Sequence, residues 1–171
     1  MGPVTAAVAN AGIVAPAARV DQMSVDRMRR VLEVNVLGVM LTVREAVRRM
    51  STRHGGTGGS IVTVSSIASR LGSPNEYVDY AASKGAVDSF TVGVAREVAS
   101  EGIRANVVRP GIIDTELHSS GGQPDRAARL GLQIPMQRAG GADEVAEAIV
   151  WLLSESAYYA TGAIIDVGGG R

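Results

Sequence analysis

Two side chains with complementary proton chemistry lie four residues apart in the stretch Tyr80-Ala81-Ala82-Ser83-Lys84. In a helix this spacing places the phenol and the ammonium on one face, one turn apart. The cation favours the phenolate, so it lowers the pKa of the phenol from about 10 toward neutrality, where a side chain exchanges protons efficiently. Lys84 is also the only lysine in the chain. The pair is therefore a candidate general acid and base.

The composition is that of a globular protein with one domain. Hydrophobic residues make up 46% of the 171 residues and charged residues 20%, which provides a core and argues against disorder. The net charge is zero, so we expect neither nucleic acid nor a membrane as a partner. The chain has no cysteine, which excludes disulfides and thiolate metal sites and fits a cytoplasmic location.

Neither a metal site nor a signal peptide is expected. The two histidines, His54 and His118, lie far apart in the sequence and have no acidic cluster at ligand spacing. The apolar stretch Met1–Ala18 lacks a basic region and is interrupted by Asn10 and Gly12, so it does not read as a signal peptide. No apolar run approaches the length of a transmembrane helix.

Strands alternate with helices along the chain. Short apolar runs predict four strands, at Val4–Ala9, Ile61–Val64, Arg104–Val108 and Ala163–Val167. Apolar residues at helical spacing predict three long helices, which run from the N-cap Ser24 to about Met50, from Tyr77 to Ser100, and onward from Asp143. The glycine-rich stretch 54–60 follows a helix and opens a strand, the reverse of a phosphate-binding loop, so we interpret it as a flexible connection. This order predicts an α/β fold, a parallel sheet with helices on both faces and right-handed crossovers.

Three further features stand where a site could form. Asn35 interrupts an apolar helix face, and it is either satisfied by a neighbouring carbonyl or functional. Ser65 and Ser66 follow the second strand, at the edge where parallel sheets bind ligands, although serines there are commonly turn residues. Residues 70–75 read as a loop, and the polar, glycine-containing stretch 116–135 has the composition of a mobile lid.

These motifs follow one another in a recognisable order. An Asn-Ala-Gly turn, Asn10 to Gly12, follows the first strand, Asn35 lies in the next helix, and Ser66 follows the next strand. Tyr-x-x-x-Lys then opens a helix, and Pro-Gly-x-x-x-Thr follows the third strand, at residues 110–115. Over essentially the whole chain this order resembles the classical short-chain dehydrogenase/reductase family, in particular its bacterial sugar-dehydrogenase and ketoreductase-like members. The resemblance implies a Rossmann-type fold and an NAD- or NADP-dependent oxidoreductase that interconverts a secondary alcohol and a ketone by hydride transfer.

The resemblance also assigns roles to matching positions. It implies that Tyr80 is the general acid/base and that Lys84 lowers its pKa and binds the nicotinamide ribose. Ser66 is implied to polarise the substrate oxygen, and Asn35 to hold a water that links Lys84 to solvent. The implied cofactor-binding residues are Asn10, Gly12, Tyr80, Lys84, Pro110, Gly111, Ile113 and Thr115, and the backbone of Ile113 is expected to bind the carboxamide. The implied partners are a small alcohol or carbonyl substrate and further copies of the chain, in a homodimer or homotetramer built on the two long helices.

The sequence departs from the family pattern in three places. Ala9 stands where the family usually has a first asparagine. Ser66 lies fourteen residues before Tyr80, one more than is usual, so Ser65 is kept as a second candidate. The N-terminal strand and glycine turn that hold the pyrophosphate in the family have no counterpart here. We therefore expect a single partial Rossmann-type domain over residues 1–171, N-terminally truncated to about four of seven strands, with an exposed edge on its first strand.

This departure leaves two alternatives to the enzyme hypothesis. The first is a truncated, non-catalytic relative that keeps the site residues, cannot hold the cofactor and acts as an association partner. The second is an α/β binding module that retains only the substrate pocket.

Overall fold

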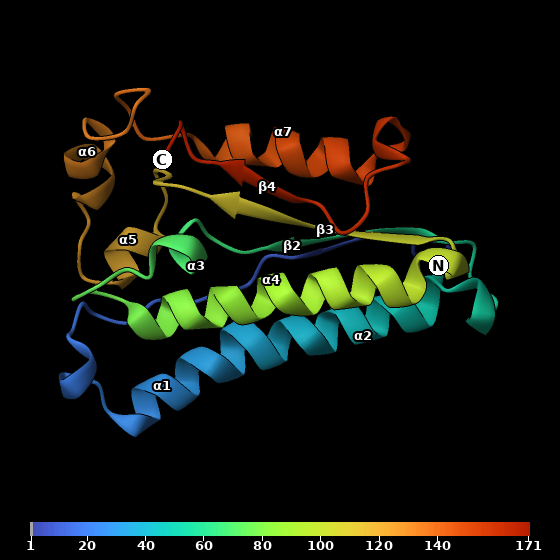
Figure 1. Ribbon diagram of the computed structural model, residues 1–171, viewed down its shortest axis with the longest axis horizontal. Coiled ribbons are helices and arrows are strands. Elements are labelled where there is room, and N and C mark those ends of the chain that lie inside the picture. Colours follow the sequence, from blue (N-terminus) through green and yellow to red (C-terminus); the bar gives the residue numbers. More distant parts are fainter. Residues whose placement is uncertain (1) are drawn as a thin grey trace.

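Four parallel strands form one sheet whose carboxyl ends meet at the same edge (Figure 1). The computed structural model describes residues 2–171. Its strands are β1 (Ala6–Ala9), β2 (Gly59–Val64), β3 (Ile103–Pro110) and β4 (Ile164–Val167), in the order β1-β2-β3-β4. The parallel sheet that the alternation of elements predicts is confirmed.

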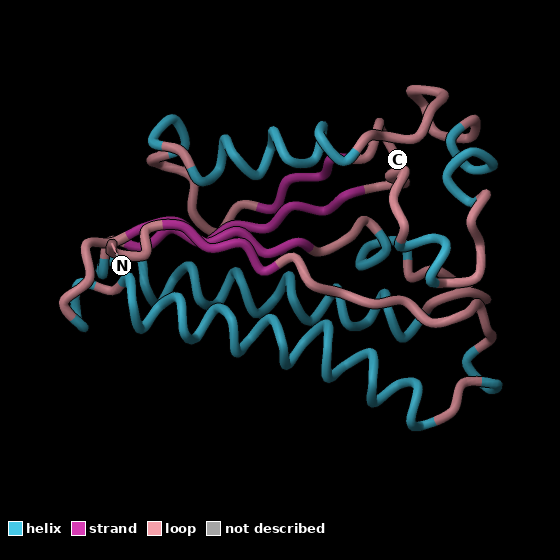
Figure 2. Tube along the Cα trace, turned by 180° about the vertical axis from the view of Figure 1, so that it is seen from behind, coloured by secondary structure: helices cyan, strands magenta, loops and turns pink. Residues whose placement is uncertain are grey.

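Helices cover both faces of the sheet, as Figure 1 and the reverse view in Figure 2 show. The elements on one face are α1 (Val25–Leu32), the π-helical turn η2 (Glu33–Leu37), α2 (Gly38–Met50) and α4 (Val78–Val98). The other face is covered by α7 (Ala142–Leu153).

Two hydrophobic clusters hold these layers together. Ile61 of β2 packs with Met50 and Val87 on the α2 and α4 side, whereas its neighbour Val62 packs with Leu152 of α7. The alternation of side chains along β2 thus buries it on both faces. Each fully buried aliphatic side chain of this size contributes about 1.5–3 kcal/mol to folding.

The predicted helix from Ser24 to Met50 is continuous but contains a widened turn. Ser24 caps it, because its Oγ accepts a hydrogen bond of 3.2 Å from the backbone N–H of Arg27. The π-helical turn η2 is centred on Asn35, whose side chain is fully buried. Single π-turns inside α-helices are rare and often occur at functional sites. The residue that the sequence marks as unfavourable in a helix therefore lies where the helix is irregular.

The remaining helices gather at the carboxyl edge of the sheet (Figure 1). They are α3 (Ala68–Leu71), α5 (Leu117–Ser120) and α6 (Arg126–Gly131). Short 3₁₀ turns complete the chain at η1 (Val20–Gln22), η3 (Thr52–His54), η4 (Ala99–Glu101) and η5 (Glu155–Ala157).

Some predicted boundaries are wrong. The prediction of a loop over 70–75 misses the end of α3, because a single helical turn is too short to show a period. Strand β1 begins two residues later than predicted, and β3 continues to Pro110. Pro110 stays in the strand because it pairs with Val167 and its carbonyl accepts a hydrogen bond from the N–H of Ile67.

Strand β1 has one partner, β2, among residues 2–171, so its other edge is unpaired, as expected. Val8 on this strand is 41% exposed. None of the helices in the described part of the chain is both long and apolar enough to cross a membrane.

Candidate active site

Tyr80 and Lys84 lie on consecutive turns at the start of α4, as predicted. Lys84 is 3% exposed, and its Nζ donates a hydrogen bond of 2.8 Å to the carbonyl of Val64 at the end of β2. The same nitrogen lies 5.6 Å from the centroid of the Tyr80 ring. The end of β2 thus fixes the position of the ammonium near the phenol.

Burial dominates the proton affinity of both groups. It raises the pKa of Tyr80, and a hydrogen bond with the side chain of Ser66 acts in the opposite direction. It lowers the pKa of Lys84 to about 8, whereas the carboxylate of Asp88 raises it. The expected lowering of the Tyr80 pKa is therefore not observed here, because desolvation of the phenol outweighs an ammonium that is directed at Val64.

Asn35 ties the loop after β1 to the first turns of α4. Its Oδ1 accepts a hydrogen bond of 2.8 Å from the N–H of Ile13, and its Nδ2 donates to the carbonyl of Ile13 at 2.9 Å. The Nδ2 also donates to Ser83 Oγ at 3.1 Å, and Ser83 in turn donates to the carbonyl of Tyr80 at 2.7 Å. Of the two interpretations left open, the side chain fits the satisfied one, and the water-holding role of Asn35 stays a prediction.

The two serines after β2 have different environments. Ser65 is 2% exposed, and its hydroxyl donates to the carbonyl of Lys84 at 3.0 Å, so it is committed to holding α4. Ser66 is half-buried and accepts a hydrogen bond of 3.1 Å from the N–H of Ala68. Its side chain also lowers the pKa of Tyr80, against the effect of burial. This geometry favours Ser66, the first candidate, over Ser65.

A cavity of about 740 Å³ opens at the carboxyl edge of the sheet. Its lining includes all eight residues predicted to bind cofactor: Asn10, Gly12, Tyr80, Lys84, Pro110, Gly111, Ile113 and Thr115. A Cβ on Gly12 would lie 3.3 Å from Lys84 Nζ, so a larger residue there would crowd the ammonium. Across residues 2–171 no cluster of three or more histidine or acidic side chains could hold a metal ion.

A second cavity, of about 90 Å³, adjoins the first and shares six of its lining residues. Ser66 and Tyr80 are among the shared residues, so the predicted proton donor borders both cavities. The smaller cavity is also lined by Tyr77 and by Arg126. Sequence reasoning missed Arg126, because nothing in the pattern distinguishes it from Arg129 on the same short helix.

A buried ion pair supports Lys84 from the next turn of α4. Asp88 Oδ2 accepts hydrogen bonds from Nη2 of Arg109 at 2.8 Å and from its Nε at 3.1 Å. Sequence reasoning missed this pair too. The spacing of four residues between Lys84 and Asp88 is the signal that could have found it.

Comparison with known proteins agrees with this fold. Residues 1–171 match a family model described as Enoyl-(Acyl carrier protein) reductase. A crystal structure of a short-chain type dehydrogenase/reductase from Mycobacterium marinum superposes with a TM-score of 0.90 at 35% identity, covering 99% of this chain and 65% of that one. The chain belongs to the short-chain dehydrogenase/reductase family of oxidoreductases.

Two curated relatives are similar along nearly the whole chain. Uncharacterized oxidoreductase YgfF of Escherichia coli K12 is 58% identical over 169 residues, which is 99% of this chain and 68% of the relative. Cis-4-hydroxycyclohexanecarboxylate dehydrogenase of Sinomonas cyclohexanicum is 40% identical over 169 residues, again 99% of this chain and 66% of the relative. The chain therefore spans about two thirds of the length of these relatives.

Proposed function

We propose that this chain acts in an NAD(P)-dependent oxidoreductase that interconverts a secondary alcohol and a ketone, with Tyr80 as the general acid/base. The observation that carries the proposal is the position of Tyr80. With Ser66 it lines both the 740 Å³ cavity, which Lys84 also lines, and the smaller cavity that adjoins it. The name of one relative, cis-4-hydroxycyclohexanecarboxylate dehydrogenase, supports an alcohol as the group that reacts.

The larger cavity suits the nicotinamide end of a cofactor. Its volume of about 740 Å³ lies within the range typical of small-molecule sites, about 300–1,000 Å³. Asn10 and Gly12 would lie along the cofactor, Lys84 would bind the ribose, and the backbone of Ile113 would bind the carboxamide. When bound, the nicotinamide ring supplies or accepts the hydride.

The raised pKa of Tyr80 keeps the phenol protonated at neutral pH, so in reduction it can donate its proton to the carbonyl oxygen. Ser66 donates a hydrogen bond to the same oxygen and stabilises the alkoxide that develops there. In oxidation Tyr80 must first lose its proton, and the nearby ammonium of Lys84 stabilises the phenolate that results. A positioned acid of this kind contributes about 10²–10⁴-fold to the rate.

Replacement of Tyr80 by Phe tests this role, because the substitution removes only the phenolic oxygen. We expect Tyr80→Phe to lose at least about 100-fold in kcat while it keeps the cofactor affinity of the parent chain. The affinity is measured by titration with NADH and NADPH, followed by nicotinamide fluorescence. An unchanged kcat would remove Tyr80 from the chemistry, and no binding of either cofactor at millimolar concentration would remove the cofactor from the proposal.

A further inference from the structure

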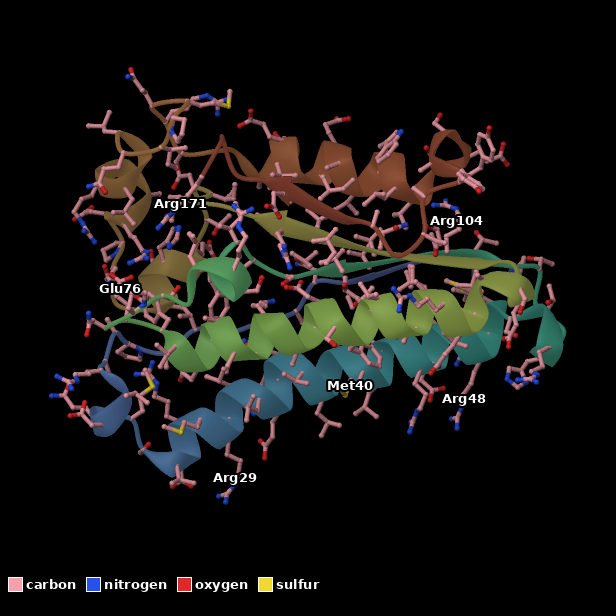
Figure 3. The ribbon with its side chains drawn as sticks, viewed as in Figure 1. Arg29, Met40, Arg48, Glu76, Arg104 and Arg171 are labelled. Atoms are coloured by element: carbon pink, nitrogen blue, oxygen red, sulfur yellow. The ribbon has the colours of Figure 1, made fainter. Side chains whose placement is uncertain are left out.

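Arg126 brings a buried positive charge to the wall of the smaller cavity. It is the first residue of α6 and is 8% exposed, and it lines the same cavity as Ser66 and Tyr80. Figure 3 shows its ion-pair partner Glu76, together with Arg171, at the end of the molecule where α5 and α6 lie. A buried guanidinium is costly unless its N–H groups are paired, so its partners indicate what it is for.

The partners of Arg126 orient it but leave donors free. Its Nη1 donates to Glu76 Oε1 at 2.7 Å and lies 3.5 Å from Gln123 Oε1. Its Cζ lies 5.2 Å from the centroid of the Tyr77 ring, a cation–π contact that holds the plane of the group. The Nε and Nη2 atoms have no hydrogen-bond partner among residues 2–171 and are not sealed from solvent.

The charged side chains that line this cavity are basic. Two arginines, Arg126 and Arg171, are among its lining residues, and none of its lining residues within 2–171 is acidic. Glu76 pairs with Arg126 from outside the wall. His118, which also lines the cavity, has its pKa lowered by burial, so it is neutral at pH 7. An anionic group is the complement of such a wall.

We infer that the substrate carries a carboxylate, which binds the free N–H groups of Arg126 while its alcohol or ketone oxygen lies at Tyr80 and Ser66. This inference rests on the proposed function and names its substrate class. The cavity is small, about 90 Å³, which favours a short acid. The substrate is therefore a small hydroxy acid and its keto acid. Arg126 is the residue that determines this specificity, and Glu76 and Tyr77 position it.

Calorimetric titration of the purified chain separates this role from a purely structural one. The probes are 3-hydroxybutyrate and its neutral amide, 3-hydroxybutanamide, which differ in charge and little in shape. The variants are Arg126→Gln, Arg129→Gln as a matched control on the same helix, and Glu76→Gln. Arg129 is exposed and does not line the cavity. Thermal unfolding of each variant checks that it folds.

We expect the parent chain and Arg129→Gln to bind the acid about 10–100-fold more tightly than the amide, and Arg126→Gln to lose this preference. Glu76→Gln should keep or increase the preference, because it frees a further donor of Arg126. If Arg126 serves only to hold α6 through its ion pair, Glu76→Gln will instead behave like Arg126→Gln, which overturns the inference. Equal binding of acid and amide, or no binding of the acid, also overturns it.

The proposed function and the carboxylate subsite at Arg126 can fail independently of each other. Binding is measured without cofactor or turnover, so a carboxylate preference that depends on Arg126 supports the subsite even where no hydride transfer is found. Conversely, turnover of neutral and charged substrates with equal kcat/KM supports the enzyme and overturns the subsite.

Discussion

Lys84 Nζ donates its hydrogen bond to the carbonyl of Val64 from a position that is 3% exposed, and this burial lowers the pKa of Lys84 to about 8. The ammonium is thus close to losing its proton under the conditions in which the site has to work. Asp88 counteracts the burial, and Arg109 in turn holds Asp88 in place. The proton affinity of Lys84 therefore depends on Asp88 and, through it, on Arg109.

The single lysine makes this pKa directly measurable. In protein labelled with ¹³C-lysine, the Cε signal of Lys84 should titrate with a pKa of about 8, and in Asp88→Asn the pKa should fall further, because the carboxylate raises it. A pKa near 10.5 in the folded protein would contradict the burial of the ammonium.

The same shift predicts how stability depends on pH. Below about pH 8 Lys84 is protonated in both the folded and the unfolded chain, so the full cost of burying its charge lowers the free energy of unfolding. Between about pH 8 and 10.5 the unfolded chain binds more protons, so the free energy of unfolding rises with pH. Urea unfolding should show this rise in the parent chain relative to Lys84→Met, in which the titrating group is absent.

The side chain of Asn35 makes three hydrogen bonds to residues that lie far away in the sequence. Asn35→Ala leaves both backbone groups of Ile13 without their partner and removes the hydrogen bond that the Ser83 hydroxyl accepts. We expect a loss of about 2–4 kcal/mol in the free energy of unfolding, measured in urea. Thr42→Ala serves as control, because Thr42 is exposed and bonds only to Gly38 of its own helix, and its loss should stay within about 0.5 kcal/mol.

At the scale of elements, the sequence predicts the long helices and buried strands well, because a period of 3.6 or a run of β-branched residues extends over many positions. It fails for α3 and α5, each of four residues, because one turn contains no repeat. The π-turn at η2 is an intermediate case. Asn35 is recognisably unusual in a helix, but the widened turn depends on partners 22 and 48 residues away in the chain.

The residues of the candidate site also differ in whether the sequence alone could predict them. Tyr80 and Lys84 could be predicted because their spacing lies within one helix. Arg126 could not, since its importance comes from a contact with Glu76 fifty residues earlier and from a cavity that several elements close. The family resemblance places Ser66 ahead of Ser65, but the physical difference between them requires the packed structure, in which the Ser65 hydroxyl donates to the carbonyl of Lys84.

The outer face of α1 and η2 is apolar and groove-shaped. Leu32 is 46% and Leu37 is 51% exposed, and both line this groove with Met40, which Figure 3 shows on the outer side of α2. We propose that this face joins copies of the chain, as the family resemblance implies. Leu32→Arg should therefore shift the chain toward monomer in light scattering, whereas Val20→Arg, at a residue that is 56% exposed outside the groove, should not. A parent chain that is already monomeric would contradict the proposal.

At the scale of the whole molecule, the parallel sheet is what makes a site possible. Residues from the turn after β1, the serines after β2 and the loop after β3 reach one cavity only because the strands point the same way and end at one edge. Helices α2 and α4 pack on one face of this sheet and α7 on the other. The sequence predicts this arrangement from the order of elements, whereas the volume and charge of the two cavities require the packed structure.

Transfer of deuterium from a labelled cofactor tests the central proposal most directly. The chain is incubated with NADH or NADPH carrying deuterium at either face of C4, and with acetoacetate or cyclohexanone as ketone. We predict one deuterium at the carbinol carbon of the alcohol, from one face of one of the cofactors, and at least about 100-fold less product with Tyr80→Phe. An alcohol without deuterium, no alcohol from any combination, or equal labelling by Tyr80→Phe would contradict the proposal.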